Sequence, residues 1–523
     1  MPETETALQR YTPDVNPWLI AVAVILPTFM EVLDTSIATV ALPYIAGSLS
    51  SSVNEASWVL TFYLLSNAVI LPASAWFSLR FGRRNYLIVS VVVFTIASFF
   101  CGAADSLLMI LIARLVQGAA GGGLQPLSQA ILTESFPREK LGLAMAVYGL
   151  GVVVAPILGP TLGGWFILHY SWRWAFYFKI PVGFIAVALI LRYVKDPPYI
   201  KNASPGRFDS IGFGLLALGL GSLQIMLDRG QQDDWFGSVM IRWLFCIMIV
   251  CLVGFVFSQL RHKKTLVDLS VFKYRNFTVG CLLIFLFGAA IYAAITLLPL
   301  YYQTVMGYSG WWAGLVVAPR GVGAILGMVV IGALISRIDT RIMVAAGFVI
   351  FAVCSLFWGH IDLQIGPWSF LIPIVVSGFA SGMVFVPLSA VALGELPNAM
   401  VGNGSGLYNL MRNIGGSIGI SVFETLLARH EQLRHSQLVQ HLASGSVVAQ
   451  NHLHSLTDMF SNFASGATAH DQAIAAVGRE INRQAALLSY VDDFRYMALA
   501  CFCCLPVVWM LKSVRGRSRA GAH

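Results

Sequence analysis

Long apolar runs separated by short polar segments dominate this chain. A helix needs roughly 20 apolar residues to cross the hydrocarbon of a bilayer. We place such runs at 17–43, 56–77, 86–104, 107–132, 142–167, 175–193, 210–228, 239–260, 277–302, 311–335, 343–360, 369–393, 401–428 and 496–512. The pattern therefore predicts an all-α integral membrane protein with about fourteen transmembrane helices.

The composition supports a membrane protein and argues against a soluble one. Charged residues are only 11% of the chain, hydrophobic residues are 57%, and the mean hydropathy is +0.75. Soluble domains carry about a quarter charged residues. The eight cysteines all fall inside apolar runs, where a disulfide framework or a thiolate metal site is not expected. We expect neither a metal nor a cofactor.

The basic residues mark one side of the predicted membrane topology. Lysine and arginine gather in alternate loops, whereas the short loops on the other side hold only Arg173 and Arg229. Because cytoplasmic loops are enriched in these residues, we expect both termini in the cytoplasm. The net charge of +8 is thus a topology signal, and no nucleic-acid partner is expected.

Two sequence marks recur at a spacing of eight predicted helices. Leu42-Pro43 ends the first span and Leu298-Pro299 lies late in the ninth; the pair Arg80 and Arg84 recurs as Arg337 and Arg341. Internal repeats are typical of transporters. We expect a six-helix bundle within 1–195, a two-helix insert and linkers within 196–276, and a second six-helix bundle within 277–523. The second bundle includes an outer polar segment, 429–495.

Charged residues inside the predicted spans are the main candidates for function, because burying them in hydrocarbon is costly. Glu31 and Asp34 lie three residues apart, so they share one helix face. A carboxylate near the middle of the bilayer suits proton binding and release, and Arg114 is its candidate partner. The alternative is a buried ion pair that only fixes packing. The next clearest intramembrane charges are Arg320, Arg412 and Glu424.

Two further segments have unusual composition. Pro156, Gly159, Pro160, Gly163 and Gly164 fall within one span, which predicts a bendable or tightly packed helix beside the transport pathway. The outer segment 429–495 holds His430, His435, His441, His452, His454 and His470. Their spacing does not repeat like that of metal ligands. We expect an exposed helix and loop that offers a docking surface for a partner.

Three motifs make the chain similar to the EmrB-like, fourteen-span drug:proton antiporters of the major facilitator superfamily. Residues 33–43 resemble the first-span motif of that family, residues 114–118 its fourth-span motif, and residues 159–164 its fifth-span antiporter motif. Residues 224–230, with Asp234-Trp235-Phe236, resemble the EmrB-like subgroup. The resemblance implies the major facilitator fold and roles in proton coupling for Asp34 and Arg114, and Glu31, on the same face of the span as Asp34, is expected to help them.

The loop after the second span departs from the family pattern G-x-x-x-D-R-x-G-R-R. Arg80, Gly82, Arg83 and Arg84 are kept, but Ala75 replaces the first glycine and Leu79 replaces the aspartate. The missing acid puts a charge lock at the cytoplasmic gate in doubt.

The resemblance implies a proton-coupled exporter of amphipathic drugs in the bacterial inner membrane. Gln117, Arg320, Asn409, Arg412 and Glu424 are candidates for substrate binding or coupling. A periplasmic adaptor (membrane fusion) protein and an outer-membrane channel are the implied partners. The alternatives are a dedicated exporter of one natural product, such as an aromatic acid or siderophore, and a receptor that does not transport. A membrane-embedded enzyme is not expected, because H-E-x-x-H, a G-x-S-x-G beside a plausible base and a paired acidic metal motif are absent. An ATP-driven pump is not expected either, because the sequence has no P-loop.

Overall fold

A computed structural model gives the fold of the chain. It describes residues 15–137, 140–197, 200, 208–261, 266–335, 337–443, 447–462 and 466–512. Every regular element in this part of the chain is a helix. In hydrocarbon no water is present to satisfy backbone N–H and C=O groups, so apolar runs of this length satisfy them internally as helices. Part of the basic loops on which the predicted orientation depends lies outside the described residues.

The helices up to residue 193 follow the first six predicted spans closely. The first membrane helix, α1, starts at an N-cap where the Asn16 side chain accepts a hydrogen bond from the backbone N–H of Trp18 at 3.0 Å. The bounds up to residue 193 are α1 Pro17–Ser48, α2 Val53–Ala56, α3 Trp58–Phe81, α4 Arg83–Gly102, α5 Leu107–Gly121, α6 Leu124–Ser135, α7 Leu141–Gly149, η3 Leu150–Val154, α8 Ala155–His169, α9 Trp174–Tyr177 and α10 Lys179–Tyr193.

The remaining helices include two that pack mainly on each other, α12 and α13, and two that are unusually long, α19 and α21. The bounds are α12 Ser210–Arg229, η4 Trp235–Gly237, α13 Val239–Arg261, η5 Leu269–Lys273, α14 Arg275–Thr304, α15 Gly310–Val317, α16 Pro319–Leu334, α17 Thr340–Trp358, η6 Pro367–Phe370, α18 Leu371–Gly394, α19 Asn398–Ala443, α20 Val447–Ser461, α21 Gly466–Cys503 and α22 Leu505–Val508. Helix α13 is very apolar but little buried, as expected of a helix that faces lipid.

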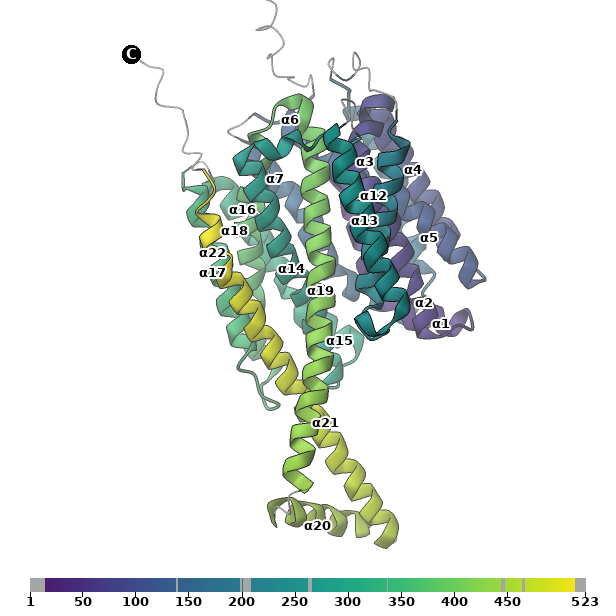
Figure 1. Ribbon diagram of the computed structural model, residues 1–523, viewed down its shortest axis with the longest axis vertical. Coiled ribbons are helices and arrows are strands. Elements are labelled where there is room, and N and C mark those ends of the chain that lie inside the picture. The colour runs from purple at the N-terminus through teal and green to yellow at the C-terminus, as the bar shows by residue number, and fades with distance from the viewer. Residues whose placement is uncertain are drawn as a thin grey trace, which may run out of the picture.

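The number of spans is only partly as predicted. Eleven helical segments of the described chain are long and apolar enough to cross a membrane, and the bent pair Leu141–Val154 and Leu158–His169 brings the number to 12. The predicted spans 401–428 and 496–512 lie in α19 and at the end of α21 with α22. These helices also run along the bundle (Figure 1), but they are not among the 12. The predicted total of fourteen is therefore not confirmed.

The outer polar segment forms a helical extension. Helix α19 runs the length of the bundle and continues below it; α20 lies across the far end, and α21 returns to the bundle (Figure 1). We call α20, the end of α19 and the start of α21 the helical extension. Arg434 of α19 pairs with Asp492 of α21 at 2.7 Å where the two helices meet. The described part of this segment, for which an exposed helix and loop were expected, is thus mostly helix.

Helices from early and late parts of the chain touch at both ends of the bundle. A methyl group on Gly142 of α7 would overlap Ile335, which directly follows α16. At the opposite end, Gly164 of α8 lies against Trp311 of α15, and Gly314 lies against Thr161. Early and late helices are therefore packed against each other at these two places in this conformation.

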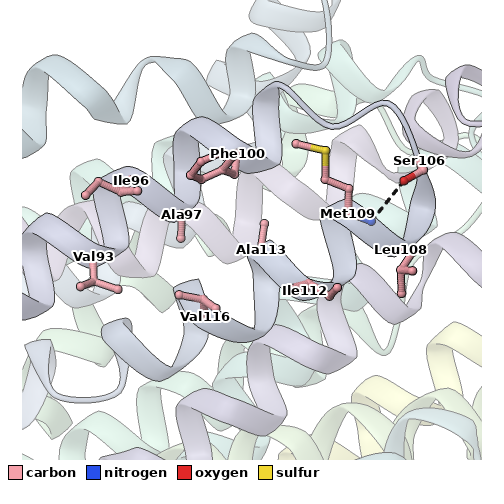
Figure 2. Close-up of a pocket in the computed structure, with 10 residues that line it drawn as sticks. All are labelled: Val93, Ile96, Ala97, Phe100, Ser106, Leu108, Met109, Ile112, Ala113 and Val116. Carbon is pink, nitrogen blue, oxygen red and sulfur yellow. Dashed lines mark hydrogen bonds between the residues drawn. The ribbon is translucent and has the colours of Figure 1, made fainter.

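A large apolar groove lies on the outside of the bundle (Figure 2). It has a volume of about 560 Å³ and is formed by α4 and α5, with Ile96, Phe100, Leu108 and Ile112 in its lining. All four side chains are exposed. An exposed apolar surface of this kind is the normal lipid-facing surface of a membrane helix bundle, so the groove is not the candidate functional site.

Candidate functional site

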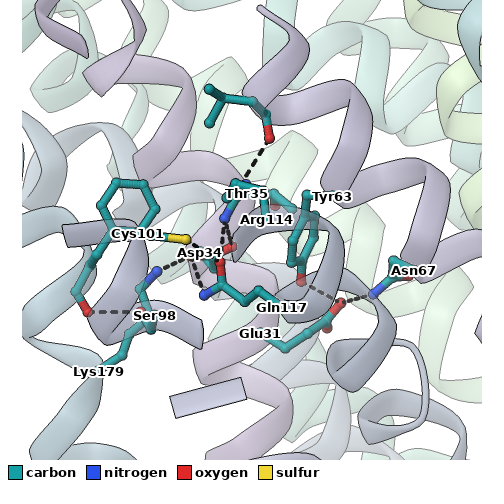
Figure 3. Close-up of polar contacts among 12 residues, drawn as sticks. Glu31, Asp34, Thr35, Tyr63, Asn67, Ser98, Cys101, Arg114, Gln117 and Lys179 are labelled. Atoms are coloured by element: carbon teal, nitrogen blue, oxygen red, sulfur yellow. Dashed lines mark hydrogen bonds and ion pairs between the residues drawn. The ribbon is translucent and has the colours of Figure 1, made fainter. Parts of the chain in front are cut away.

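Asp34 lies at the centre of a fully buried ionic cluster (Figure 3). Its Oδ2 accepts a hydrogen bond from Arg114 Nη1 at 2.5 Å, and its Oδ1 contacts Lys179 Nζ. Gln117 donates to Asp34 Oδ1 at 3.4 Å and accepts from Arg114 at 2.9 Å. The side chains of Asp34, Arg114 and Lys179 are all 0% exposed. Helices α1, α5 and α10 therefore meet at a carboxylate that has no access to solvent.

Further contacts hold Arg114 in a fixed orientation. Its Nε donates to the backbone oxygen of Val59 at 3.0 Å, and its guanidinium lies 4.3 Å from the ring centre of Tyr63. The backbones of α3 and α5 approach closely here, since a methyl group on Gly118 would be 2.2 Å from the carbonyl oxygen of Tyr63. Small residues at such contacts let membrane helices pack tightly. The sequence around Arg114 thus places its side chain against Asp34.

Glu31 belongs to a second polar cluster. Its Oε1 accepts hydrogen bonds from Asn67 at 3.0 Å and from the Tyr63 hydroxyl at 3.3 Å, and its Oε2 accepts one from Gln125 at 2.5 Å. Glu31 is 3% exposed. The two acids predicted to share one face of α1 are therefore both buried, but they have different partners. Tyr63 lies between the two clusters, since its ring contacts Arg114 and its hydroxyl donates a hydrogen bond to Glu31.

Gln125 connects the Glu31 cluster to the second half of the chain. It donates to Glu31 and accepts a hydrogen bond from Arg412 Nη2 on α19. Arg412 is buried, and its Nε and Nη1 have no hydrogen-bond partner in the described part of the chain. Arg412 is also the charged residue in the lining of a cavity formed by η3, α8, α14, α18 and α19.

That central cavity is small and mostly apolar. Its accessible volume is about 20 Å³, which is room for about one water molecule. Val153 and Pro156 line it from one side, and Phe287, Tyr292 and Phe385 line it from the other. The lining therefore brings early and late segments of the chain together around one guanidinium.

The proline- and glycine-rich residues of the fifth span pack directly on α1. The span is divided into α7, a π-helical turn (η3) and α8, with a bend of 42°. Ser36 on α1 donates a hydrogen bond to the carbonyl of Pro156 at 2.7 Å. A methyl group on Gly159 would be 2.2 Å from Ser36 Oγ, and one on Gly163 would be 3.3 Å from Ile37. Pro160 is the proline inside α8, and Gly164 faces Trp311.

The loop after α3 has acidic partners in spite of Leu79. Arg83 forms a buried ion pair with Glu134 at the end of α6, with a distance of 2.5 Å between Nη1 and Oε2. Asp196 accepts a hydrogen bond from the backbone N–H of Arg84 at 2.9 Å. Gly82 has φ +82°, and a methyl group there would be 2.6 Å from Asp196. Arg80 is exposed. Two acids distant in sequence thus contact the basic loop where the motif acid is missing.

The other candidate residues lie apart from the Asp34 cluster. Asn409 is fully buried and donates to Gln129 at 2.7 Å, so it joins α19 to α6. Glu424 lies further along α19, close enough to Asp228 of α12 for electrostatic interaction. Arg320 is fully buried without a hydrogen-bond partner for its guanidinium in the described residues, and it lies 5.7 Å from the ring centre of Phe351. Of this group, Gln117 alone reaches Asp34.

Arg114 was expected as a partner of Asp34, but the sequence analysis missed several other direct partners of the two acids. Lys179, Gln125, Asn67 and Tyr63 all lie inside predicted spans and contact Asp34 or Glu31. Lys179 carries a charge in an apolar run, which is a usable signal. The two amides and the tyrosine indicate a functional site only weakly, because such side chains also form ordinary hydrogen bonds between membrane helices. Among the described residues, no group of three or more His, Cys, Asp or Glu side chains is placed to hold a metal ion.

A helical bundle of this length, with its charged side chains turned inward, is the architecture of a multi-pass membrane transporter. The sequence profile of the Major Facilitator Superfamily matches residues 24–420. The chain is 35% identical over 512 residues to the multidrug export protein EmrB of Escherichia coli (strain K12), covering 97% of this chain and 98% of that protein. It is 34% identical over 490 residues to the fatty acid resistance protein FarB of Neisseria gonorrhoeae, covering 93% and 94%.

Solved structures agree on the fold. The proton:xylose symporter XylE bound to 6-bromo-6-deoxy-D-glucose matches with a TM-score of 0.58 at 16% identity, over 94% of this chain and 96% of that one. This chain belongs to the Major Facilitator Superfamily. The resemblance seen in its motifs and the predicted fold class are thereby confirmed.

Proposed function

We propose that this protein exports amphipathic drugs or other toxic small molecules and that it drives their export with protons. Relatives named for multidrug export align with nearly the entire chain, which supports drug export over a dedicated exporter of one natural product. The proposal of proton coupling rests on one observation: the Asp34 carboxylate is fully buried and paired with Arg114 and Lys179. Burial of this ionic cluster in hydrocarbon costs free energy, and charged residues inside membrane spans commonly have a function such as proton transfer.

In the proposed cycle the two six-helix bundles, within 1–195 and 277–523, rock against each other. The substrate site is the central cavity beside Arg412, enlarged when the two bundles separate. Proton uptake by the buried cluster around Asp34, helped by Glu31 and Arg114, favours one orientation of the bundles, and proton release favours the other. The Glu31–Gln125–Arg412 chain of contacts joins the two bundles, so substrate at Arg412 is coupled to the acidic residues of α1.

We further propose that the protein works in the bacterial inner membrane, with cytoplasmic termini and a periplasmic adaptor and outer-membrane channel as partners. The helical extension is the candidate docking surface for the adaptor. Leu433, Met459 and Ile474 are exposed on it, where neither lipid nor the bundle covers them. Exposed apolar side chains outside the membrane are typical of protein interaction sites.

Replacement of Asp34 tests proton-driven export directly. In inside-out membrane vesicles, wild-type protein should accumulate ethidium or oleate when the interior is acidic, and a protonophore should abolish this accumulation. Asp34→Asn removes the negative charge that Arg114 and Lys179 share but keeps the size of the side chain, so accumulation should fall at least about tenfold.

The matched control is Asp105→Asn, because the Asp105 side chain is 91% exposed and pairs weakly with Arg173. This variant should transport like the wild type. Both variants must be present in the membrane at wild-type levels. Wild-type accumulation by Asp34→Asn would remove the coupling role proposed for this carboxylate.

A further inference from the structure

Lys179 is a buried cation that the proposed cycle does not yet use. It is the first residue of α10 and is 0% exposed. Its amino group contacts Asp34 Oδ1, and Asp34 is its only hydrogen-bond partner among the described residues. Its other neighbours are aromatic, with Nζ lying 4.7 Å from the ring centre of Phe176 and 5.8 Å from that of Phe178. Lys179 therefore has one polar contact and an otherwise apolar environment.

The charges around Lys179 do not balance if every group is ionised. Helix α1 supplies one carboxylate, Asp34, and α5 supplies a guanidinium, Arg114. Helix α4 supplies the neutral thiol of Cys101, which donates to Gln117, and α3 supplies the phenol of Tyr63. Glu31 is held by Asn67, Tyr63 and Gln125 in the other cluster. One negative charge thus faces two cations at a site closed to water.

Only one of these two cations can readily become neutral. An arginine guanidinium keeps its proton in proteins. A lysine amine releases its proton more easily when it is buried, and such lysines serve as proton acceptors in enzymes. With Lys179 neutral, the Asp34–Arg114 pair leaves the cluster without net charge. With Lys179 protonated, the cluster carries one positive charge that the surrounding hydrocarbon does not compensate.

We propose that Lys179 Nζ is the atom that takes up and releases the transported proton. This inference rests on the proposed function, and it assigns the proton to the amine while Asp34 stays ionised. On uptake an N–H bond forms between Nζ and a proton from the water on one side of the membrane. On release that bond breaks and the proton passes to water on the other side. Asp34 Oδ1 orients the amine and stabilises its charged form.

Two substitutions separate proton transfer from a purely structural ion pair. Lys179→Gln removes the titratable group, whereas Lys179→Arg keeps a cation beside Asp34 but cannot release its proton. The variants are reconstituted in liposomes with ethidium and oleate as probes. One assay measures accumulation driven by a pH gradient, and the other measures exchange of labelled for unlabelled probe at equal pH. Exposed Lys273, changed to Gln and to Arg, provides matched controls.

Both Lys179 variants should lose gradient-driven accumulation at least about tenfold and keep exchange within about twofold of the wild type. Gradient-driven accumulation by Lys179→Arg would overturn the proposal, because a permanent cation would then suffice. Loss of exchange in both variants would also overturn it, since Lys179 would then be needed for the structure of the site. If the wild type itself shows no gradient-driven accumulation, the proposed function fails.

A proton count on the purified protein tests Lys179 independently of transport. Detergent-solubilised wild type and Lys179→Arg are titrated between about pH 5 and about pH 9, and the protons released per chain are compared. The wild type should release about one proton more than Lys179→Arg, and Lys273→Arg should match the wild type. Equal proton release by the wild type and Lys179→Arg would overturn the proposal even if transport is proton-driven.

Discussion

Individual polar side chains in this protein are paired across large distances in the sequence. Asp34 is separated from Arg114 by 80 residues and from Lys179 by 145. Arg83 finds its acid in Glu134, on another helix, although the family motif would have supplied one four residues earlier, at Leu79. Because each pair is buried, removing one partner should destabilise the protein far more than removing one partner of an exposed pair.

Glu134→Gln tests whether the Arg83 pair holds the loop after α3 in place. The amide keeps a hydrogen-bonding oxygen but loses the charge that compensates the buried guanidinium. Breaking a buried ion pair costs about 3–5 kcal/mol, so the free energy of unfolding, measured by denaturation in detergent, should fall by about 3 kcal/mol.

The control for Glu134→Gln is Glu480→Gln. Glu480 also pairs with a basic side chain, His452, but its own side chain is 59% exposed. This substitution should change the free energy of unfolding by less than about 0.5 kcal/mol. Equal effects of the two substitutions would show that burial of the Arg83 pair makes no difference.

Several charged residues of the spans, and the pairing of Asp34 with Arg114, could be predicted from the sequence, but the other contacts of these residues could not. Asp34, Glu31 and Arg114 stand out because charges in hydrocarbon are rare. Which carboxylate takes which partner depends on how α1, α3, α5, α6 and α10 rotate about their axes, and a periodicity of 3.6 residues does not fix this rotation. Lys179 was missed for a related reason, since it lies near the start of its span, where a lysine commonly reaches the membrane surface.

Among the helices, the contact between α1 and α8 is the tightest of those that involve the proline- and glycine-rich run. The backbones approach so closely that Ser36 reaches the carbonyl of Pro156. The bend between α7 and α8 follows from this composition, because a proline removes a backbone hydrogen bond and a π-helical turn shifts the register of those around it. The sequence therefore predicts both the bend and the close packing.

Gly159→Ala should disturb this contact, whereas Gly164→Ala should not. The added methyl group on Gly159 would lie 2.2 Å from Ser36 Oγ and 3.0 Å from the backbone carbon of Ser36. Overpacking of this kind costs about 1–3 kcal/mol, and transport in vesicles should fall with stability.

The methyl group of Gly164→Ala would meet Trp311 at 3.6 Å, which is ordinary contact. Both substitutions gain the same helix propensity. The difference between their free energies of unfolding therefore measures the effect of the clash alone. A Gly159→Ala protein as stable and active as Gly164→Ala would show that α1 and α8 can move apart without cost.

At the level of the entire molecule, most membrane helices could be placed from the sequence because hydrocarbon thickness sets their length. The last two predicted spans are less clear, because α19 and α21 continue as polar helices well beyond the apolar part. Hydropathy alone does not predict that one helix continues beyond the bundle and that another returns to it. The division into two six-helix bundles and an insert stays a prediction, as do the cytoplasmic termini.

The helical extension should be required for adaptor binding but not for transport itself. Changing Leu433 and Ile474 together to Asn removes apolar contact area from its exposed surface without affecting the bundle. Drug resistance of cells that carry the variant should fall, and co-purification of a membrane fusion protein should be lost.

Ethidium accumulation in inside-out vesicles, which needs no adaptor, should stay at the wild-type level in this double variant. The matched control changes Ile211 and Phe184, exposed side chains on membrane helices, to Ala and should keep resistance. Unchanged resistance and co-purification in the Leu433 and Ile474 variant would contradict a docking role for the extension.

The small volume of the central cavity has an energetic consequence for any molecule that enters it. Drug-sized ligands occupy sites of about 300–1,000 Å³, whereas this space holds about one water molecule. With this cavity as the proposed substrate site, a drug binds only the fraction of molecules whose helices have parted, and its measured dissociation constant exceeds the intrinsic one by the inverse of that fraction. Loosening the contacts between Gly142 and Ile335, or between Gly164 and Trp311, would raise affinity without adding a single contact to the drug.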